Sequence, residues 1–367
     1  MMTPRAIPPI SRRSFLGTVA AGSALAAAVP ARSAVPAQEI AGSRILRTIP
    51  RTGEPVPAIG MGSLHTFDVF PGGPRGNIME IMRRFYMGGG RVVDTSPLYG
   101  ASEVNIGDFA TVLGISDELF IANKVSVTGD HPDDGSHARQ SFEQSLQRLW
   151  RGGLDVVHVH ATANSAVMIP LLNAWKREGR IRHLGVSHHE GLGFDALTQW
   201  VEAGEIDFVQ LPYSIHTRTA EQRVLEAAAD QGVAVLTTMP FEKARLFRIV
   251  EGRPLPGFAR EIGVENWAQF FLKWVISHPA ITCAVPATTD PDHMSENIGA
   301  LQGQLPDAGM RARMLRHMEA IPGFAALAAM PPYPDKQLQG FARPVRRSPS
   351  NAVIRQQDRP RGHSKVI

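Results

Sequence analysis

Cysteine is almost missing from this sequence of 367 residues, which contains only Cys283. A single thiol cannot form an internal disulfide, and it cannot build a zinc or iron–sulfur site from several cysteines. Charged residues make up 20% of the chain and hydrophobic residues 43%. That balance is too apolar for a disordered polymer and too charged for a protein that crosses a membrane many times.

The middle of the chain lacks an excess of positive charge, although the whole chain carries a formal net charge of +4. Residues 1–37 contain four arginines and no acid, and residues 334–367 contain eight bases and two acids. Residues 38–333 therefore carry 26 bases and 32 acids, a net charge of −6. Because the basic character belongs to the two ends, the central segment gives no reason to expect a nucleic-acid partner.

The first 37 residues follow the order of an export signal. Arg12 and Arg13 stand shortly before a mild apolar run at 18–29, and small residues follow at 31–37. This order is typical of a secretory signal peptide, and the paired arginines resemble the twin-arginine export signal. The run is too short and too rich in Ala and Gly for a stable membrane span. We expect a twin-arginine signal peptide at 1–37, the twin-arginine export machinery as a partner, and a periplasmic or exported protein. A chance pair of arginines before an Ala-rich helix is the alternative.

The last segment, 334–367, is rich in Arg, Pro, Ser and Gln and has almost no apolar periodicity. This composition predicts a basic, disordered tail. A nucleic-acid-binding arm would interleave aromatic residues with its bases, and this tail has only Phe341 near its start. We expect no nucleic-acid partner.

Short β-rich runs alternate with helical stretches between these two ends. The expected strands are Ile59–Gly62, Val92–Ser96, Phe120–Val125, Leu154–His160, His183–Ser187, Phe208–Tyr213, Val233–Thr238 and Thr282–Ala287. Helical patterns include Ile78–Tyr86, Ala138–Trp150, Met168–Glu178, Ala220–Gln231 and Trp267–Ser277. Strands that single helices separate pair in parallel through right-handed crossovers. Eight such units predict one α/β domain at 38–333, a (β/α)8 TIM barrel.

A doubly wound sheet is the competing fold. It would carry a G-x-G-x-x-G turn between its first strand and the following helix. The sequence lacks that turn, since Gly88-Gly89-Gly90 precedes a strand instead of opening a helix. The pattern favours the barrel.

Ionisable residues end three neighbouring strands of the expected barrel, where a purely structural strand would carry Val or Ile. Asp94, Lys124 and His160 hold these positions, and Tyr99 follows Asp94 closely. Chemistry in such barrels lies at the carboxyl ends of the strands. An ammonium group lowers the pKa of a nearby phenol, and a carboxylate keeps that ammonium charged. A histidine can hydrogen-bond a substrate oxygen, so the four residues suit proton donation to a carbonyl that receives a hydride. Each residue alone is more often a structural ion or a core residue.

Motifs spread over residues 46–321 resemble the aldo/keto reductase family, and most closely its exported members with twin-arginine signals. The matching stretches are Gly60-Met61-Gly62, Asp94-Thr95-Ser96-x-x-Tyr99-Gly100, Lys124, Leu154-Asp155-x-x-x-x-His160, Leu184-Gly185-Val186-Ser187, Val209-Gln210-x-x-Tyr213-Ser214, and Val285-Pro286-Ala287-Thr288 leading to Glu296-Asn297.

The resemblance implies an NAD(P)H-dependent oxidoreductase that reduces an aldehyde or ketone to an alcohol, with a small-molecule carbonyl as substrate and no metal. Tyr99 would donate the proton, Lys124 and Asp94 would tune it, and His160 would orient the carbonyl. Ser187 and Gln210 would hold the nicotinamide amide, and Tyr213 would stack on the nicotinamide ring. The cofactor-binding residues that the resemblance implies are Ser187, His188, Gln210, Tyr213, Pro240, Thr288, Thr289, His293, Glu296 and Asn297.

The chain departs from the family pattern at two cofactor positions. His188 stands where the family usually has an asparagine that grips the carboxamide. The segment 286–290 lacks the Lys or Arg that often contacts the 2′-phosphate of NADP, although Lys243 or Arg245 could supply that charge. We therefore expect NADP(H) by resemblance, with NAD(H) as a possible cofactor.

Two other functions fit parts of the sequence. The pair His158-x-His160 points to one side of a strand, as in metal-dependent barrel hydrolases, but later strands offer no further ligands. A non-catalytic, nicotinamide-binding sensor is the second alternative, and it would not need all four catalytic groups. Without a heptad pattern we expect a monomer. Aromatic residues that could line the substrate pocket or anchor its loops are Phe67, Phe70, Phe241, Phe247 and Tyr333.

Overall fold

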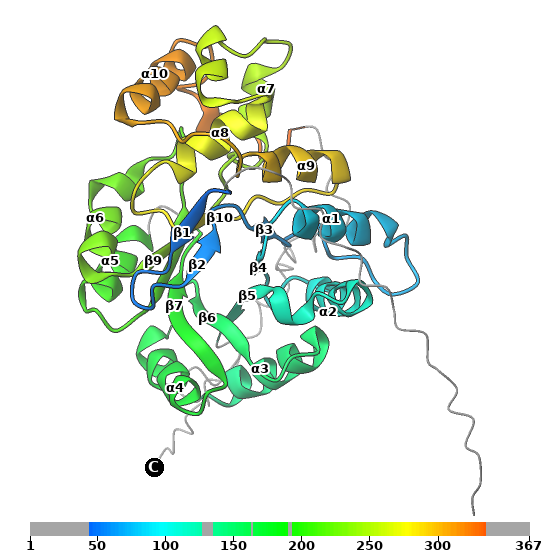
Figure 1. Cartoon of the computed structure of the whole chain (residues 1–367). Helices are drawn as coiled ribbons and strands as arrows, with labels where there is room; N and C mark the ends of the chain where they lie inside the picture. Colours follow the sequence, from blue (N-terminus) through cyan, green and yellow to red (C-terminus); the bar gives the residue numbers. More distant parts are fainter. Residues whose placement is uncertain (1–43, 127–134, 163, 190–192, 335–367) are drawn as a thin grey trace, which may run out of the picture. The chain divides into compact units, whose positions relative to one another are not determined.

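The computed structural model describes residues 44–126, 135–162, 164–189 and 193–334. Eight strands of this part form one sheet in the order β10-β9-β8-β7-β6-β5-β4-β3, and every neighbouring pair is parallel. Helices surround these strands (Figure 1). The predicted (β/α)8 barrel is confirmed. The predicted signal peptide at 1–37, and the predicted tail beyond Pro334, lie outside the described residues.

The elements follow one another in strict alternation through most of the barrel. The strands are β1 (Leu46–Thr48), β2 (Pro55–Pro57), β3 (Met61–Gly62), β4 (Val92–Asp94), β5 (Phe120–Val125), β6 (Leu154–His160), β7 (Ile181–Ser187), β8 (Phe208–Pro212), β9 (Ala234–Thr238) and β10 (Cys283–Ala284). The α-helices are α1 (Gly76–Met87), α2 (Ser102–Leu113), α3 (Ser136–Leu149), α4 (Ser165–Arg177), α5 (Phe194–Glu202), α6 (Val224–Gln231), α7 (Arg245–Val250), α8 (Trp267–Ile276), α9 (Pro291–Gly299) and α10 (Ala308–Glu319). Short 3₁₀ helices are η1 (Ser116–Glu118), η3 (Thr219–Gln222), η4 (Gly257–Ile262) and η5 (Leu327–Ala329).

The predicted helix Ala220–Gln231 is broken in the structure. A 3₁₀ turn ends at Gln222 and α6 begins at Val224, with Arg223 between them at φ −155°. The apolar spacing across this segment reflects two short helical pieces that bury one side each. Periodicity alone does not reveal such a break, because buried residues continue on both sides of it, with Ala220 before it and Val224 after it.

The barrel closes between its first and last strands through backbone bonds around two glycines. Gly60 N donates to Ala284 O at 2.8 Å, and Gly62 N donates to Pro286 O at 2.8 Å. A Cβ on Gly60 would lie 2.7 Å from Val92 O. Strands can approach this closely only without a side chain, which explains the Gly-x-Gly spacing at the start of the barrel.

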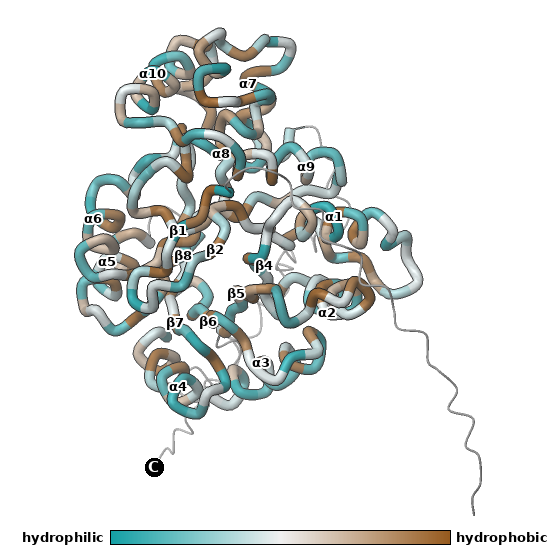
Figure 2. Tube along the Cα trace, viewed as in Figure 1, coloured by the Kyte–Doolittle hydropathy of each residue, from teal (hydrophilic) through white to brown (hydrophobic). Residues whose placement is uncertain are grey.

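Two buried apolar clusters hold the fold. One lies inside the barrel and includes Phe120, Phe208, Leu236 and the free Cys283, whose thiol pKa is raised by burial. Ile49, next to the β1–β2 hairpin, joins this inner cluster. The other, larger cluster lies between the strands and the helices. Figure 2 shows this amphipathic pattern, with hydrophilic turns on helices such as α4 and α6 and an apolar stretch along β8. No helix of the described residues has the length and apolar character needed to cross a membrane.

Candidate active site

A buried ion pair forms the centre of the site at the carboxyl ends of β4 and β5. Lys124 Nζ donates to Asp94 Oδ1 at 2.6 Å and to Thr95 O at 2.9 Å. The two side chains are only 2% and 5% exposed. Burial opposes the charge of Lys124, but Asp94 and Tyr99 more than offset this effect, so the pKa of Lys124 is raised. Lys124 is therefore held as an ammonium ion.

Tyr99 lies in the short segment between β4 and α2 and faces this ion pair. Lys124 Nζ lies 5.0 Å from the centroid of the Tyr99 ring. Burial raises the pKa of Tyr99 and Asp94 adds to the rise, whereas Lys124 lowers it. The expected lowering by Lys124 is present, but burial outweighs it in this structure. Tyr99 is a protonated phenol at neutral pH, with the cation that can stabilise its anion beside it.

His160 completes the group from the end of β6. Its ring meets the Tyr99 ring edge-on, with centroids 6.1 Å apart, and its Nδ1 lies 3.5 Å from Ser96 Oγ. Burial, helped by the charge of Lys124 and by His189, lowers the pKa of His160 to about 3. A neutral imidazole keeps one N–H donor and one acceptor, so His160 can donate to a carbonyl oxygen. The structure thus brings the four predicted catalytic residues together.

A carboxylate that the sequence did not single out holds the loop of Tyr99. Ala101 N donates to Asp68 Oδ1 at 2.8 Å, just after the tyrosine. Gly100 has φ +58°, and a Cβ there would lie 2.0 Å from Asp68 Oδ1. A glycine is required both by the left-handed backbone and by the space that Asp68 occupies. Asp68 stands in a loop of irregular structure, so no periodic signal could have identified it.

A second polar contact fixes the strand that carries Lys124. Asn123 Nδ2 donates to Glu103 Oε1 at 2.9 Å, and Lys124 N donates to Asn123 Oδ1 at 2.8 Å. Glu103 also accepts from Arg148 Nη1 at 3.1 Å and is fully buried on α2. Since α2 follows Tyr99 directly, this contact ties the lysine strand to the tyrosine loop. In the sequence, the signal that could have pointed to this contact is a polar residue, Asn123, directly before Lys124 in an apolar strand.

Ser187 and Gln210 lie side by side at the ends of β7 and β8, where their Cα atoms are paired in register. Ser187 Oγ donates to Val159 O at 3.1 Å. Gln210 Nε2 donates to Asp94 Oδ1 at 2.7 Å, which connects the predicted cofactor residues to the buried ion pair. A hydroxyl and an amide at one strand edge are a donor and acceptor set that fits a carboxamide.

His188 follows Ser187 directly, and its backbone N–H is already used by Gln210 O at 3.0 Å. Its ring stacks on that of His189, with centroids 5.6 Å apart and an interplanar angle of 10°. A contact from His188 to a cofactor would have to come from this partly buried ring.

The expected stacking role of Tyr213 is not supported by the structure. Tyr213 is fully buried, and its ring packs against Trp274 at 5.4 Å and His278 at 5.9 Å. Its hydroxyl donates to Glu221 and accepts from Arg311 Nη2 at 3.0 Å. A side chain enclosed in this way has no free face for a nicotinamide. Tyr213 instead joins β8 to α8 and α10, and we exclude it from the cofactor site.

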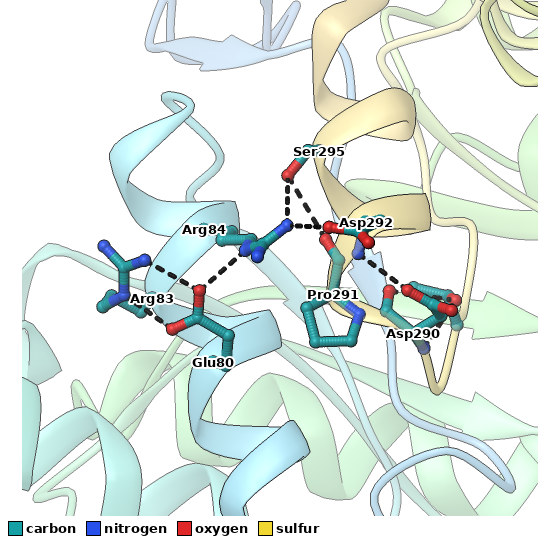
Figure 3. Close-up of polar contacts among 8 residues, drawn as sticks. Glu80, Arg83, Arg84, Asp290, Pro291, Asp292 and Ser295 are labelled. Atoms are coloured by element: carbon teal, nitrogen blue, oxygen red, sulfur yellow. Dashed lines mark hydrogen bonds and ion pairs between the residues drawn. The ribbon is translucent and has the colours of Figure 1, made fainter.

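Five other predicted cofactor residues lie in the turn before α9 and along this helix. Asp290 caps this helix, with Oδ1 accepting Asp292 N at 2.8 Å, and Thr288 Oγ1 accepts Asp290 N at 3.0 Å. The nearby cation, Arg84 on α1, is bound by Asp292 at 2.5 Å and by Glu80 at 2.7 Å (Figure 3). The predicted residues here are Thr288 and Thr289 in the turn and His293, Glu296 and Asn297 on the helix, of which His293 is exposed and Asn297 buried.

Pro240 lies in a turn after β9 whose backbone has an unusual conformation. Four non-glycine residues of this turn have positive φ angles between 53° and 68°: Met239, Glu242, Lys243 and Ala244. Such conformations are costly for residues with a Cβ and persist only where surrounding contacts hold them. Here Ser214 Oγ donates to the buried Glu242 Oε1 at 2.5 Å, and Tyr333 N donates to Lys243 O at 2.8 Å.

The aromatic residues considered for substrate contact divide into two groups. Phe67 is fully buried, and Phe241 and Phe247 pack on each other at 4.8 Å and on Phe271. These three anchor loops. Phe70 is 72% exposed, and Tyr333 is half-buried and meets the ring of His65 edge-on at 6.3 Å.

His158, the first histidine of the His-x-His pair, is a buried core residue. Its Nδ1 lies 3.3 Å from Asn123 O, and its ring meets Phe208 edge-on at 6.3 Å. The described residues contain no group of three His, Cys, Asp or Glu side chains placed to hold one metal ion.

Fold and site together define a (β/α)8 barrel with a proton-donating centre at the carboxyl ends of its strands. The sequence model described as "Aldo/keto reductase family" matches residues 58–313. The chain belongs to the aldo/keto reductase family.

The individual relatives share about a quarter of their aligned residues with this chain. The chain is 26% identical over 214 residues to the NADH-specific methylglyoxal reductase of Escherichia coli (strain K12), a stretch that covers 49% of this chain and 63% of that protein. It is 23% identical over 317 residues to the L-galactose dehydrogenase of Arabidopsis thaliana, covering 75% of this chain and 93% of that protein. An aldo/keto reductase from Klebsiella pneumoniae, solved with NADP and acetate, has the same fold, with a TM-score of 0.60, 22% identity, and coverage of 80% of this chain and 97% of its own.

Proposed function

We propose that this protein is an NAD(P)H-dependent reductase that converts an aldehyde or ketone to the corresponding alcohol. The observation that carries the proposal is the buried group of Asp94, Lys124, Tyr99 and His160 in a barrel of this family. A protonated phenol beside an ammonium and a neutral imidazole is the arrangement that proton donation to a carbonyl needs.

The residues present fit a nicotinamide cofactor. Ser187 and Gln210 would hold its carboxamide, since their hydroxyl and amide groups are adjacent at one strand edge. When bound, the reduced nicotinamide supplies the hydride that the carbonyl carbon accepts.

The chain's own groups handle the proton. Tyr99 donates its hydroxyl proton to the carbonyl oxygen, and the ammonium of Lys124 stabilises the phenolate that remains. Asp94 keeps Lys124 charged and oriented. His160, neutral at working pH, donates an N–H to the same oxygen and fixes its direction toward Tyr99. Tyr99 then regains its proton from water.

The test is reduction of a generic aromatic aldehyde by the protein and by Tyr99→Phe. We expect the variant to lose about 100-fold or more in kcat, because it keeps the ring and loses the proton, while its Kd for the nucleotide changes little. Tyr86→Phe, on the surface of α1, is the matched control. Full activity in Tyr99→Phe would refute the assignment, and nucleotide binding without any turnover in the parent would favour the sensor alternative.

The same site supports a preference for NADH over NADPH. The segment 287–290 offers two hydroxyls and the Asp290 carboxylate, whose pKa is lowered by the backbone N–H of Asp292. Arg84 is already paired with two carboxylates. Two hydroxyls and a carboxylate suit a ribose hydroxyl better than a phosphate dianion.

Titration with both nucleotides tests this preference. We expect NADH to bind at least as tightly as NADPH. Thr289→Arg should tighten NADPH roughly 10-fold, by about one charge-assisted contact, and leave NADH unchanged, with Thr289→Gln as the uncharged control. A parent that binds NADPH ten times more tightly than NADH would disprove the preference.

We also propose that the chain is exported by the twin-arginine machinery and acts in the periplasm or outside the cell. The support is the order of charged, apolar and small residues in 1–37 and the mildly acidic barrel behind it.

A further inference from the structure

The Asp94 carboxylate receives hydrogen bonds from two sides of the barrel. Its Oδ1 lies 2.6 Å from Lys124 Nζ and 2.7 Å from Gln210 Nε2. Lys124 comes from the adjacent strand β5, whereas Gln210 comes from β8, four strands away in the order of the sheet. The bond from Gln210 therefore crosses the inside of the barrel. All three side chains are buried, so water does not screen these contacts.

The two donors affect the carboxylate differently. Lys124 brings a full charge, and Gln210 brings an uncharged N–H dipole that stabilises negative charge on Asp94. Asp94 in turn raises the proton affinity of Tyr99. A donor that draws charge toward itself weakens this effect. Gln210 is thus placed to adjust how easily Tyr99 releases its proton, without touching Tyr99.

The same residue belongs to the edge that fits a carboxamide. The Cα of Gln210 is paired in register with that of Ser187, and the backbone carbonyl oxygen of Gln210 accepts the backbone N–H of His188. An amide side chain that donates through nitrogen still has an oxygen that can accept. Ser187 differs in this respect, since its hydroxyl donates to Val159 O and does not contact Asp94.

We propose that Gln210 is a positioning residue that links the nicotinamide site to the proton donor, with Nε2 bound to Asp94 and Oε1 available to the carboxamide of the cofactor. This inference rests on the proposed function. In this proposal, the Gln210 side chain couples cofactor binding to the Asp94–Lys124–Tyr99 group. By thermodynamic linkage, any change that the cofactor makes in the Gln210–Asp94 bond appears in the proton affinity of Tyr99.

The experiment measures the pKa of Tyr99 in cofactor-free protein. The chain has only four tyrosines, so labelling them with ¹³C at the ζ carbon gives four signals, and Tyr99→Phe identifies the relevant one. Gln210→Met keeps the side-chain length and removes the donor. We expect the pKa of Tyr99 to rise by about half a unit or more, because the carboxylate loses a hydrogen bond. Gln210→Leu is a second variant, and near-UV circular dichroism confirms the fold at each pH.

Ser187→Ala is the matched control. Both residues are predicted to grip the carboxamide, so both variants should weaken nucleotide binding, but only the Gln210 variants should move Tyr99. Binding of NAD⁺ should shift the Tyr99 signal in the parent and lose that effect in Gln210→Met. A Tyr99 pKa that stays within about 0.2 units of the parent in both Gln210 variants would overturn the inference. An equal shift in Ser187→Ala would overturn it as well.

Failure of the proposed function looks different. In that case Tyr99→Phe reduces the aldehyde as fast as the parent, or the parent binds neither nucleotide. The titration of Tyr99 in the cofactor-free protein does not depend on either result.

Discussion

At the scale of single residues, burial acts in the same sense on Tyr99, Lys124 and His160, since it disfavours the charged form of each. Lys124 alone has a carboxylate in direct contact, and its pKa rises despite burial. Tyr99 stays protonated and His160 stays neutral. The site therefore holds one cation, one proton donor and one neutral hydrogen-bond donor, and the difference between them comes from contact with Asp94.

His158 provides a pH-dependence prediction at this scale. Burial, with the charge of Lys124, lowers its pKa in the folded protein to about 3. The unfolded chain, with a histidine pKa of about 6.5, binds this proton between those two values and the native state does not. Stability then rises with pH across that window and falls on acidification below pH 6.5.

We expect His158→Met to lose about 2 kcal/mol less stability than the parent when the pH drops from 7 to 5. Urea unfolding at both pH values measures this difference. His293→Gln, at an exposed position on α9, should behave like the parent. The same acid sensitivity in His158→Met as in the parent would contradict the prediction.

At the scale of elements, the barrel depends on close contacts that particular small residues permit. The first strand of the eight-stranded sheet, β3, has only two residues. Its connection to β10 runs through the backbone around Gly60 and Gly62. Gly185 on β7 has a similar function, because a Cβ there would lie 2.7 Å from the ring of His158 and 2.5 Å from Phe208 O. Local sequence predicts the strands, and these glycines determine whether their edges can meet.

Gly60→Ala tests the closure of the barrel. The added Cβ would meet Val92 O at 2.7 Å and Cys283 Sγ at 3.1 Å, and backbone cannot move away cheaply. We expect a loss of about 2–3 kcal/mol in the free energy of unfolding. Gly152→Ala is the control, since nothing lies within 4 Å of its added Cβ. Equal urea midpoints for the two variants would show that the first strand tolerates a side chain.

At the scale of the whole chain, charge separates two regions. Residues 38–333 carry a net charge of −6, and residues 1–37 carry four arginines and no acid. The apolar run behind the paired arginines in 1–37 is the segment that we propose as an export signal. The proposed signal and the barrel occupy separate parts of the sequence, so substitutions can be made in one without altering the other.

Replacing Arg12 and Arg13 together by lysine tests the proposed export signal. Lysine keeps the positive charge and removes the guanidinium pair that the twin-arginine signal requires. We expect roughly a tenfold or greater loss of the protein from the periplasmic fraction, with unchanged total amount and unchanged aldehyde reduction in the lysate. Arg5→Lys is the control. Export of the double variant at the parent's level would argue for another route.

The proximity of the four proposed catalytic residues could be predicted from the sequence, because parallel strands bring their carboxyl ends to one edge. Asp94 and His160 end β4 and β6, Lys124 is the next-to-last residue of β5, and Tyr99 follows β4 closely. The barrel assignment alone therefore places the four residues near one another. The cofactor positions depend more on how helices pack against the strands. The structure encloses Tyr213 between β8, α8 and α10, a result of helix packing that no local pattern contains.

The sequence by itself determined the parallel barrel, the presence of ionisable residues at the carboxyl ends of its strands and the terminal location of the basic charge, because these depend on period, order and composition. Tertiary structure alone decided that Tyr213 is buried, that burial outweighs Lys124 at Tyr99, and that Gln210 reaches Asp94 across the barrel. The physical reason that local sequence does not reveal these contacts is the distance between the partners along the chain. Gln210 and Asp94 are 116 residues apart, and only closure of the barrel brings an amide and a carboxylate of that separation within hydrogen-bonding range.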